Sequence, residues 1–157
     1  LAMAELRGQS RGLGWGVTTA RRSRYRERLE KMGLGLETRL KHPVSLLSGG
    51  QRQSLTLLMA TLNLPKLLLL DEHTAALDPK TARTVMTLTE EVITRNRLTA
   101  LMVTHNMRQA IHYGNRMIML HEGRIQFDAA GEEKAGLTVQ EVVSRFGRTL
   151  NDEALLG

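Results

Sequence analysis

Apolar residues recur three or four positions apart in several stretches of the chain, the spacing of helices with one buried face. This pattern predicts helices at 19–32, at 51–63, from 78 onward for about fifteen residues, and at 138–146. The predicted buried stripe of the second helix is Leu55, Leu58, Met59 and Leu62. The predicted stripe of the third helix is Ala82, Val85, Met86 and Ile93.

Boundary residues support these helices. Gly33 follows the first helix, where glycine commonly ends helices. Asp78 and Pro79 form a strong helix start, an acidic N-cap followed by proline at the first helical position. A shorter helix is expected to end at Tyr113, with Gly114 as its cap.

Short continuous apolar runs predict strands. The runs 67–71 and 99–104 are typical of strands buried on both faces. Because a helix separates them, they form a βαβ unit, and the two strands are expected to be parallel. Further along, 116–127 reads as a hairpin that turns at Glu122-Gly123. The predicted fold class is α/β, with parallel strands and an additional helical part.

Composition is that of a globular protein, with 41% hydrophobic and 24% charged residues among 157 and no cysteine. No apolar run approaches the length of a membrane span. The chain begins with leucine, and its first residues resemble the end of a helix. We therefore expect it to be a piece of a longer protein.

The net charge of +6 is unevenly distributed. Residues 1–66 carry 12 Lys/Arg against 4 Asp/Glu, and five arginines lie between Arg21 and Arg28. Such a patch can meet nucleic acid, anionic lipid or an acidic partner, or it can be a solvated helix face.

Residues Leu47, Ser48, Gly49, Gly50 and Gln51 stand immediately before or at the start of a predicted helix. Two glycines allow close approach of a ligand to the backbone, and free amides with a serine hydroxyl suit an anion such as phosphate. The same residues can also form a plain helix-capping turn.

Two acids follow the first predicted strand. Asp71 lies at the carboxyl end of that strand, where α/β folds bind ligands, and suits magnesium directly or through water. Glu72 beside it could polarise an attacking water. His105 follows the second strand at the same expected sheet edge.

The order and spacing of these motifs resemble the ATP-binding-cassette (ABC) ATPase family. Asp71 comes 23 positions after Ser48, and "DEHTAALDP" and "MVTHNM" follow. By this resemblance, 47–51 is the signature motif, which binds ATP in trans, and 67–72 is the Walker B strand of a P-loop NTPase-type core. Asp71 would then hold Mg²⁺, Glu72 and His105 would be catalytic, and Ala75, Ala76, Leu77 and Asp78 would form the D-loop.

The chain also departs from the family pattern. The phosphate loop G-x-x-x-x-G-K-[ST] is absent, and the glycine-rich stretch 8–19 has Val17 where the lysine should stand. The expected division is a partial helical subdomain at 1–46, the second half of the catalytic core at 47–129, and a helical tail at 130–157. Without the phosphate loop, this chain alone is not expected to hydrolyse ATP.

The resemblance implies the ATP-binding subunit of a bacterial importer, most similar to cassettes for aromatic amino-acid uptake. Its partners would be a second cassette in a head-to-tail dimer, transmembrane permease subunits and an extracytoplasmic solute-binding protein, with no nucleic acid. It would then lie on the cytoplasmic face of the plasma membrane. Two alternatives stay open: a cassette that acts on nucleic acid, and a non-catalytic interaction subunit.

Overall fold

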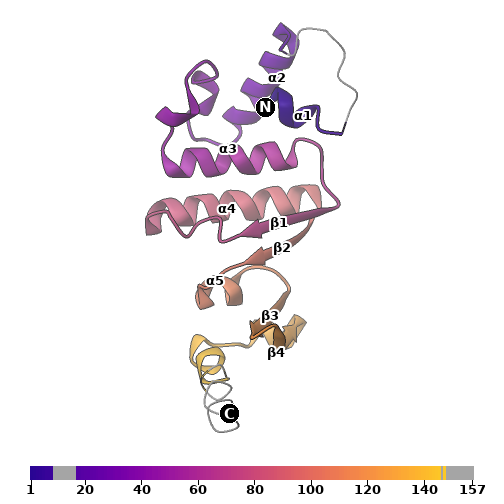
Figure 1. The fold of residues 1–157 in the computed structure, drawn as a ribbon, viewed down its shortest axis with the longest axis vertical. Coiled ribbons are helices and arrows are strands. Elements are labelled where there is room, and N and C mark those ends of the chain that lie inside the picture. The colour runs from indigo at the N-terminus through magenta and orange to yellow at the C-terminus, as the bar shows by residue number, and fades with distance from the viewer. Residues whose placement is uncertain (9–16, 146, 148–157) are drawn as a thin grey trace. The chain divides into compact units, whose positions relative to one another are not determined.

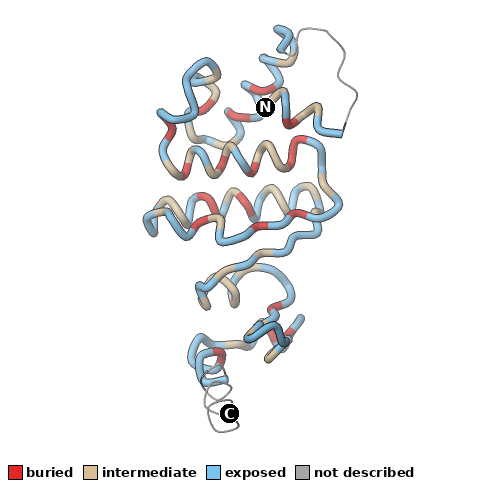
Figure 2. The backbone as a smooth tube through the Cα atoms, viewed as in Figure 1, coloured by how far each residue is buried: buried red, intermediate tan, exposed pale blue. Residues whose placement is uncertain are grey.

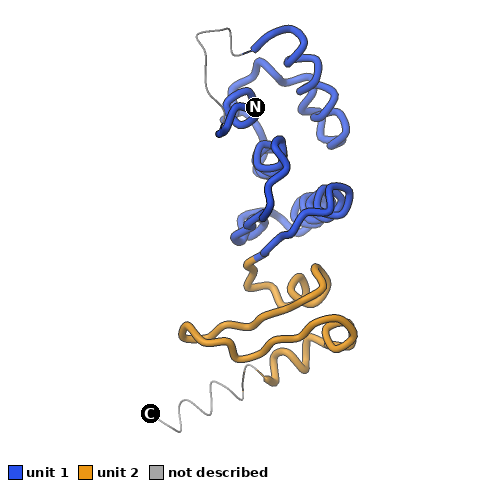
Figure 3. Tube along the Cα trace, turned by 90° about the vertical axis from the view of Figure 1, so that its right-hand side faces the viewer, with its two compact units in different colours: residues 1–102 blue, residues 103–157 orange. Residues whose placement is uncertain are grey.

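A computed structural model describes residues 1–8, 17–145 and 147 of the chain. It divides into two compact units, residues 1–102 and 103–157 (Figure 3). The first unit contains α1 (Ala2–Glu5), α2 (Thr19–Glu30), α3 (Gly49–Thr61), β1 (Leu67–Asp71), α4 (Pro79–Asn96) and most of β2 (Thr99–Val103), as Figure 1 shows. Two short 3-10 helices, η1 (Leu36–Thr38) and η2 (Val44–Leu46), precede α3.

Glu5 ties α1 to the basic helix α2. Its carboxylate accepts hydrogen bonds from Tyr25 Oη at 2.5 Å and from Arg24 Nη2 at 3.1 Å, and lies 3.5 Å from Arg21 Nε. Burial, with the hydrogen bond to Glu5, raises the pKa of Tyr25 to about 12. Part of the arginine patch therefore has a structural role within the helical region.

The core of the first unit lies between two helices and the strand pair. Leu57 of α3 packs with Leu68 and Leu70 of β1, and residues of α4 and β2 pack against this cluster. The strands β1 and β2 are hydrogen-bonded neighbours and parallel, which confirms the prediction from the βαβ order. A mixed α/β fold with a parallel sheet is thus observed.

Helices α3 and α4 pack closely because of one glycine. A Cβ added at Gly50 would lie 2.3 Å from Thr81 Cγ2, well inside van der Waals contact. The buried face of α3 is consequently Gly50, Ser54, Leu57 and Thr61. The predicted stripe was wrong for three of its four residues: Leu55, Leu58 and Met59 are only partly buried, and Leu55 and Leu58 pack against the other cluster, around Leu29, Leu36 and Leu47.

The prediction that both strands are buried on two faces was also wrong. Leu67, Leu69 and Leu101 are 49%, 65% and 53% exposed, whereas Leu68 and Leu70 are buried. Figure 2 shows this alternation as buried and exposed colours along the strand. Among the described residues of the first unit, α3 and α4 cover only the face that carries Leu68 and Leu70. A continuous apolar run shows that both faces are apolar, but it does not show that both are covered.

The second unit contains α5 (Met107–His112), β3 (Arg116–His121), β4 (Arg124–Ala130) and α6 (Gly131–Ala135). The predicted hairpin is confirmed: β3 and β4 pair antiparallel, and Glu122 and Gly123 both have positive φ in the two-residue turn. Across the pair, Arg116 and Asp128 form an ion pair. The buried Lys134 of α6 donates to the Ile111 carbonyl, and burial lowers the pKa of its ammonium group.

Most predicted helices are confirmed: the bounds of α2 and α3 moved by up to two residues, whereas α4 has 18 residues instead of about fifteen. Residues 139–145 of the last predicted helix are helical, and Phe146 lies outside the described residues, as does most of the glycine-rich stretch 8–19. The division at 46 and 129 stays a prediction. In the part of the chain that the structure describes, no helix is long and apolar enough to cross a membrane.

Candidate functional site

Ser48 begins α3 with a reciprocal cap. Its Oγ accepts a hydrogen bond from the Gln51 amide at 3.2 Å, and its own amide donates to Gln51 Oε1 at 3.1 Å. Such a capping box satisfies two amides at the start of a helix. Ser48 is exposed, and accepting from Gln51 leaves its hydroxyl proton available to donate to a ligand.

The flanks of this turn are held from two sides. The Leu47 side chain is buried with Leu29 and Leu36, and its carbonyl accepts from Arg52 Nη1 at 2.6 Å. Gln51 Nε2 donates to the Leu34 carbonyl at 3.1 Å. The turn at the α3 N-terminus is therefore held by contacts within the chain.

Asp71 and Glu72 lie where β1 ends. Both side chains are exposed, and the Asp71 carboxylate makes no hydrogen bond or ion pair with any other described residue. Glu72 has a φ of 41°, in the left-handed region that non-glycine residues rarely adopt. Strained backbone of this kind concentrates at functional sites, and here it turns the chain directly after the strand.

The turn from Glu72 to Asp78 is closed by backbone hydrogen bonds. The Ala75 amide donates to the Glu72 carbonyl at 2.9 Å, and the Leu77 amide donates to the Thr74 carbonyl at 3.2 Å. Asp78 Oδ1 then accepts from the Thr81 and Lys80 amides as the cap of α4. Hydrogen bonding from Thr81 holds the pKa of Asp78 below its usual value.

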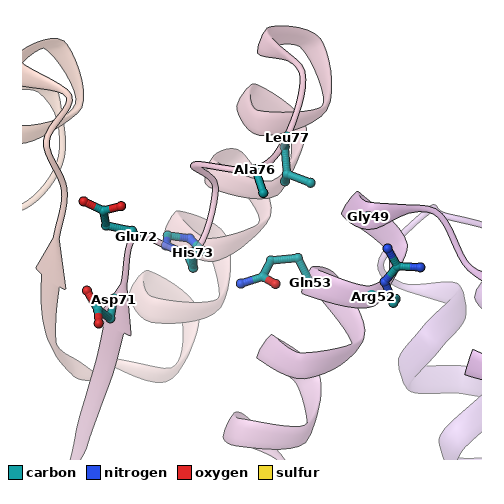
Figure 4. A pocket seen from close by; sticks show the side chains of 8 residues that line it. All are labelled: Gly49, Arg52, Gln53, Asp71, Glu72, His73, Ala76 and Leu77. Carbon is teal, nitrogen blue, oxygen red and sulfur yellow. The ribbon is translucent and has the colours of Figure 1, made fainter. Parts of the chain in front are cut away.

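The two turns meet at one open pocket of about 310 Å³. Its lining residues are Gly49, Arg52, Gln53, Asp71, Glu72, His73, Ala76 and Leu77. In Figure 4 the two acids lie on one side, Gly49 and Arg52 on the other, and Gln53 and His73 between them. The structure thus brings the start of α3, the acids at the end of β1 and two of the predicted D-loop residues to the same place.

His73 is partly buried in this pocket and packs on α4. Its Nε2 lies 3.3 Å from Thr89 Oγ1, and Thr89 itself donates to the Val85 carbonyl at 2.8 Å. Burial lowers the pKa of His73, which favours the neutral ring.

His105 belongs to the second unit, and its predicted place beside the acids stays a prediction. It is exposed and follows directly after β2. The neighbouring Thr104 Oγ1 accepts from the Asn106 amide at 3.1 Å, so the segment after β2 is an ordered turn before α5.

The sequence analysis missed Arg52, Gln53 and His73 as pocket residues. One signal was available for His73: the polar Thr89 stands in the otherwise apolar stripe of α4 and is almost fully buried. A buried hydroxyl needs a hydrogen-bonding partner, but the Val85 carbonyl of the same helix can supply it, so this signal does not by itself identify His73.

Comparison with known families gives a match to the ABC transporter family over residues 3–75. The tyrosine transport ATP-binding protein of Clostridioides difficile is 52% identical over 118 residues, covering 75% of this chain and 47% of that protein. The aliphatic sulfonates import ATP-binding protein SsuB of Burkholderia ambifaria is 41% identical over 117 residues, covering 74% of this chain and 35% of that protein. The chain thus spans half or less of the length of these relatives.

Solved structures agree with the sequence relatives. The dimeric ATP-binding cassette MJ0796 in a post-hydrolysis state with ADP and phosphate has a TM-score of 0.62 and 33% identity, covering 80% of this chain and 52% of that one. A metal-chelate type ABC transporter in an inward-facing conformation has a TM-score of 0.70 at 24% identity, which shows the fold alone. The fold is therefore that of a P-loop NTPase-type cassette. The chain belongs to the ABC transporter ATPase family.

Proposed function

We propose that this chain supplies the signature-motif and Walker B part of an ATPase that drives solute uptake. The observation that carries the proposal is that the structure exposes two separate sets of groups: the acids at the end of β1, which suit Mg²⁺, and the capped N-terminus of α3, which suits a phosphate. Members of the family hydrolyse ATP, and the cassette MJ0796 was solved with ADP and phosphate.

Asp71 fits the magnesium ion that such chemistry uses. Its carboxylate is exposed at the end of β1, and within the described residues no other group competes for it. Among those residues there is no cluster of three or more His, Cys, Asp or Glu that would form a cage. A single carboxylate suits Mg²⁺, which binds through one or two carboxylates together with substrate phosphates and neutralises their charge.

Glu72 is the proposed group that polarises the attacking water. Its backbone conformation directs it out of the strand at the pocket, where an exposed carboxylate can accept a proton from water. His105, at the start of the second unit, is proposed as a second group near the γ-phosphate. Ala75, Ala76, Leu77 and Asp78 are proposed as the D-loop of the cassette.

Ser48, Gly49 and Gly50 are proposed to contact ATP that a partner cassette holds. The amides at the start of the thirteen-residue α3 and the free Ser48 hydroxyl proton are donors suited to a γ-phosphate. Leu47 and Gln51 hold this turn in place. A head-to-tail dimer would give each ATP one chain's acids and the other chain's signature turn.

Amino-acid import is the favoured transport role. The relative named for tyrosine transport is 52% identical, against 41% for the sulfonate importer. Permease subunits, a solute-binding protein and a place on the cytoplasmic face of the membrane follow from that role. Because Glu5 already engages Arg21 and Arg24, we do not expect nucleic acid as a partner.

The catalytic proposal is tested in a completed cassette, in which this chain follows the phosphate-loop half of the tyrosine-transport relative. Replacing the base without changing its shape, Glu72→Gln, should lower the ATP turnover number by about 10²–10³-fold. Glu91→Gln, at an exposed position of α4, is the matched control and should keep normal turnover. Normal turnover by Glu72→Gln would reject the proposed role of Glu72.

The transport proposal is tested by exchange into two importers. This chain should support tyrosine uptake when it replaces the matching segment of the C. difficile protein. It should not support sulfonate uptake when it replaces the matching segment of SsuB. The reverse result would assign the chain to sulfonate import.

A further inference from the structure

His73 links the turn after β1 to helix α4, and none of the roles proposed above includes it. It follows Glu72 in the chain, lines the same pocket, and packs through its ring on the buried Thr89 of α4. We propose that His73 is a positioning residue for the attacking water: Thr89 holds its Nε2–H, and its Nδ1 accepts a hydrogen bond from water beside Glu72. This inference rests on the proposed ATPase function.

The proton count on Thr89 determines which ring nitrogen carries the hydrogen. The Val85 carbonyl can only accept, so the 2.8 Å contact requires the single hydroxyl proton of Thr89. Thr89 Oγ1 can therefore only accept from His73, and Nε2 of the ring must be the donor. In the neutral ring the lone pair then lies on Nδ1.

Thr89 is a rigid anchor for this arrangement. It is 1% exposed, and its neighbours Val85 and Met86 on the same stripe are also buried. A β-branched side chain that donates back to its own helix has little rotamer freedom. The position of the imidazole ring is consequently set by the core of the unit.

A water between Glu72 and His73 would be oriented by two acceptors. It can donate one hydrogen to the carboxylate and the other to Nδ1, so its oxygen lone pair points away from both. The pocket, at about 310 Å³ and with polar lining groups, has room for such a water. Orientation of this kind matters because small errors in the attack geometry cost large factors in rate.

Two substitutions at His73 test its contact to Thr89 and its proposed contact to water separately. In His73→Gln the terminal amide nitrogen can replace Nε2 toward Thr89, but the pocket loses the Nδ1 lone pair. In His73→Asn the side-chain oxygen can replace Nδ1 in the pocket, but the contact to Thr89 is lost.

In the completed cassette, His73→Gln should lower kcat for ATP about 10-fold with KM little changed. His73→Asn should retain more of kcat than His73→Gln, although its melting temperature should be lower. If His73 is only a structural anchor, the order reverses: His73→Gln keeps the normal kcat and His73→Asn loses it. That reversed order would overturn the proposal.

The tautomer can be measured without any substitution at His73. Nitrogen-15 NMR of histidine-labelled completed cassette should show the Nε2–H form for His73, and Thr89→Val should reduce that preference. An Nδ1–H form in the unsubstituted protein would overturn the proposal. Loss of turnover in Glu72→Gln together with normal kcat in His73→Gln would reject the role of His73 alone. Normal turnover in Glu72→Gln would reject the role of Glu72 on which the proposal rests, and no turnover in the unsubstituted completed cassette would reject the ATPase assignment.

Discussion

The turn before α3 and the turn after β1 line the same pocket but are built differently. In the first, Ser48 and Gln51 cap each other and Leu47 is anchored in the core. In the second, the Asp71 carboxylate makes no polar contact with other described residues, and Glu72 has a strained backbone. The first turn is held by its own hydrogen bonds, and the second exposes the Asp71 and Glu72 side chains.

This difference matches the two proposed tasks. A turn that must contact a phosphate held by another chain benefits from a geometry fixed before the chains meet, because less ordering is left for the association step. A carboxylate that binds a metal–nucleotide complex needs its charge exposed and uncompensated. Substitutions in each turn can therefore separate effects on folding from effects on function.

The largest effect on stability is expected at Gly50. In Gly50→Ala the new methyl group would meet Thr81 Cγ2, so α3 and α4 must move apart, at a cost of about 1–3 kcal/mol in the free energy of unfolding. Adding Thr81→Ser removes that Cγ2 while keeping the hydroxyl, and should restore most of the loss. Thermal unfolding of the completed cassette measures both. An unchanged melting temperature for Gly50→Ala would show that this close packing is not required.

A smaller effect on stability is expected at Ser48. Substitutions there can separate its role as the N-cap of α3 from its proposed role as a hydrogen-bond donor to the γ-phosphate. Ser48→Ala should lose about 1 kcal/mol of stability because the N-cap is removed. Ser48→Asp keeps an N-cap acceptor and should leave stability nearly unchanged, but its negative charge should repel a γ-phosphate. Chemical denaturation measures the first effect. Equal destabilisation by both substitutions would mean that the capping box is not what stabilises this turn.

The smallest effect is expected at Asp78, and it depends on pH. Because the pKa of Asp78 is lowered in the folded state, its contribution is present above the ordinary aspartate pKa of about 4 and is lost as the pH falls through the lowered value. Asp78→Ala should therefore reduce the melting temperature more at pH 7 than at a pH below the lowered value, where the carboxyl is protonated. Asp78→Asn, which can still cap α4, is the control. The same loss at both pH values would argue against a role for the charged cap.

Local sequence signals predicted much of this fold. The Asp78-Pro79 start of α4 and the Glu122-Gly123 turn of the hairpin depend on neighbouring residues alone, and both are confirmed. The bounds of β1 are also as predicted, since its apolar run ends sharply at the acids. These features need no knowledge of the rest of the molecule.

The features that failed depend on contacts distant in sequence. The buried face of α3 is set by the close packing of Gly50 against Thr81 of α4. Leu69 is exposed because α3 and α4 cover only the opposite face of the strand pair. In the candidate site, the acids were predictable from their place after a strand. His73 was not, because its role depends on Thr89, sixteen residues away on another element.

The central claim is that the two turns of one chain serve two different ATP molecules, so dimer formation needs Ser48 while hydrolysis needs Glu72. Its most direct test is ATP-dependent dimerisation of the completed cassette by size-exclusion chromatography. Glu72→Gln should bind ATP, close and remain a dimer, whereas Glu72→Gln combined with Ser48→Asp should bind ATP and remain a monomer. Dimerisation of the double variant equal to that of Glu72→Gln would contradict the account, and the turn before α3 would then be only a helix cap.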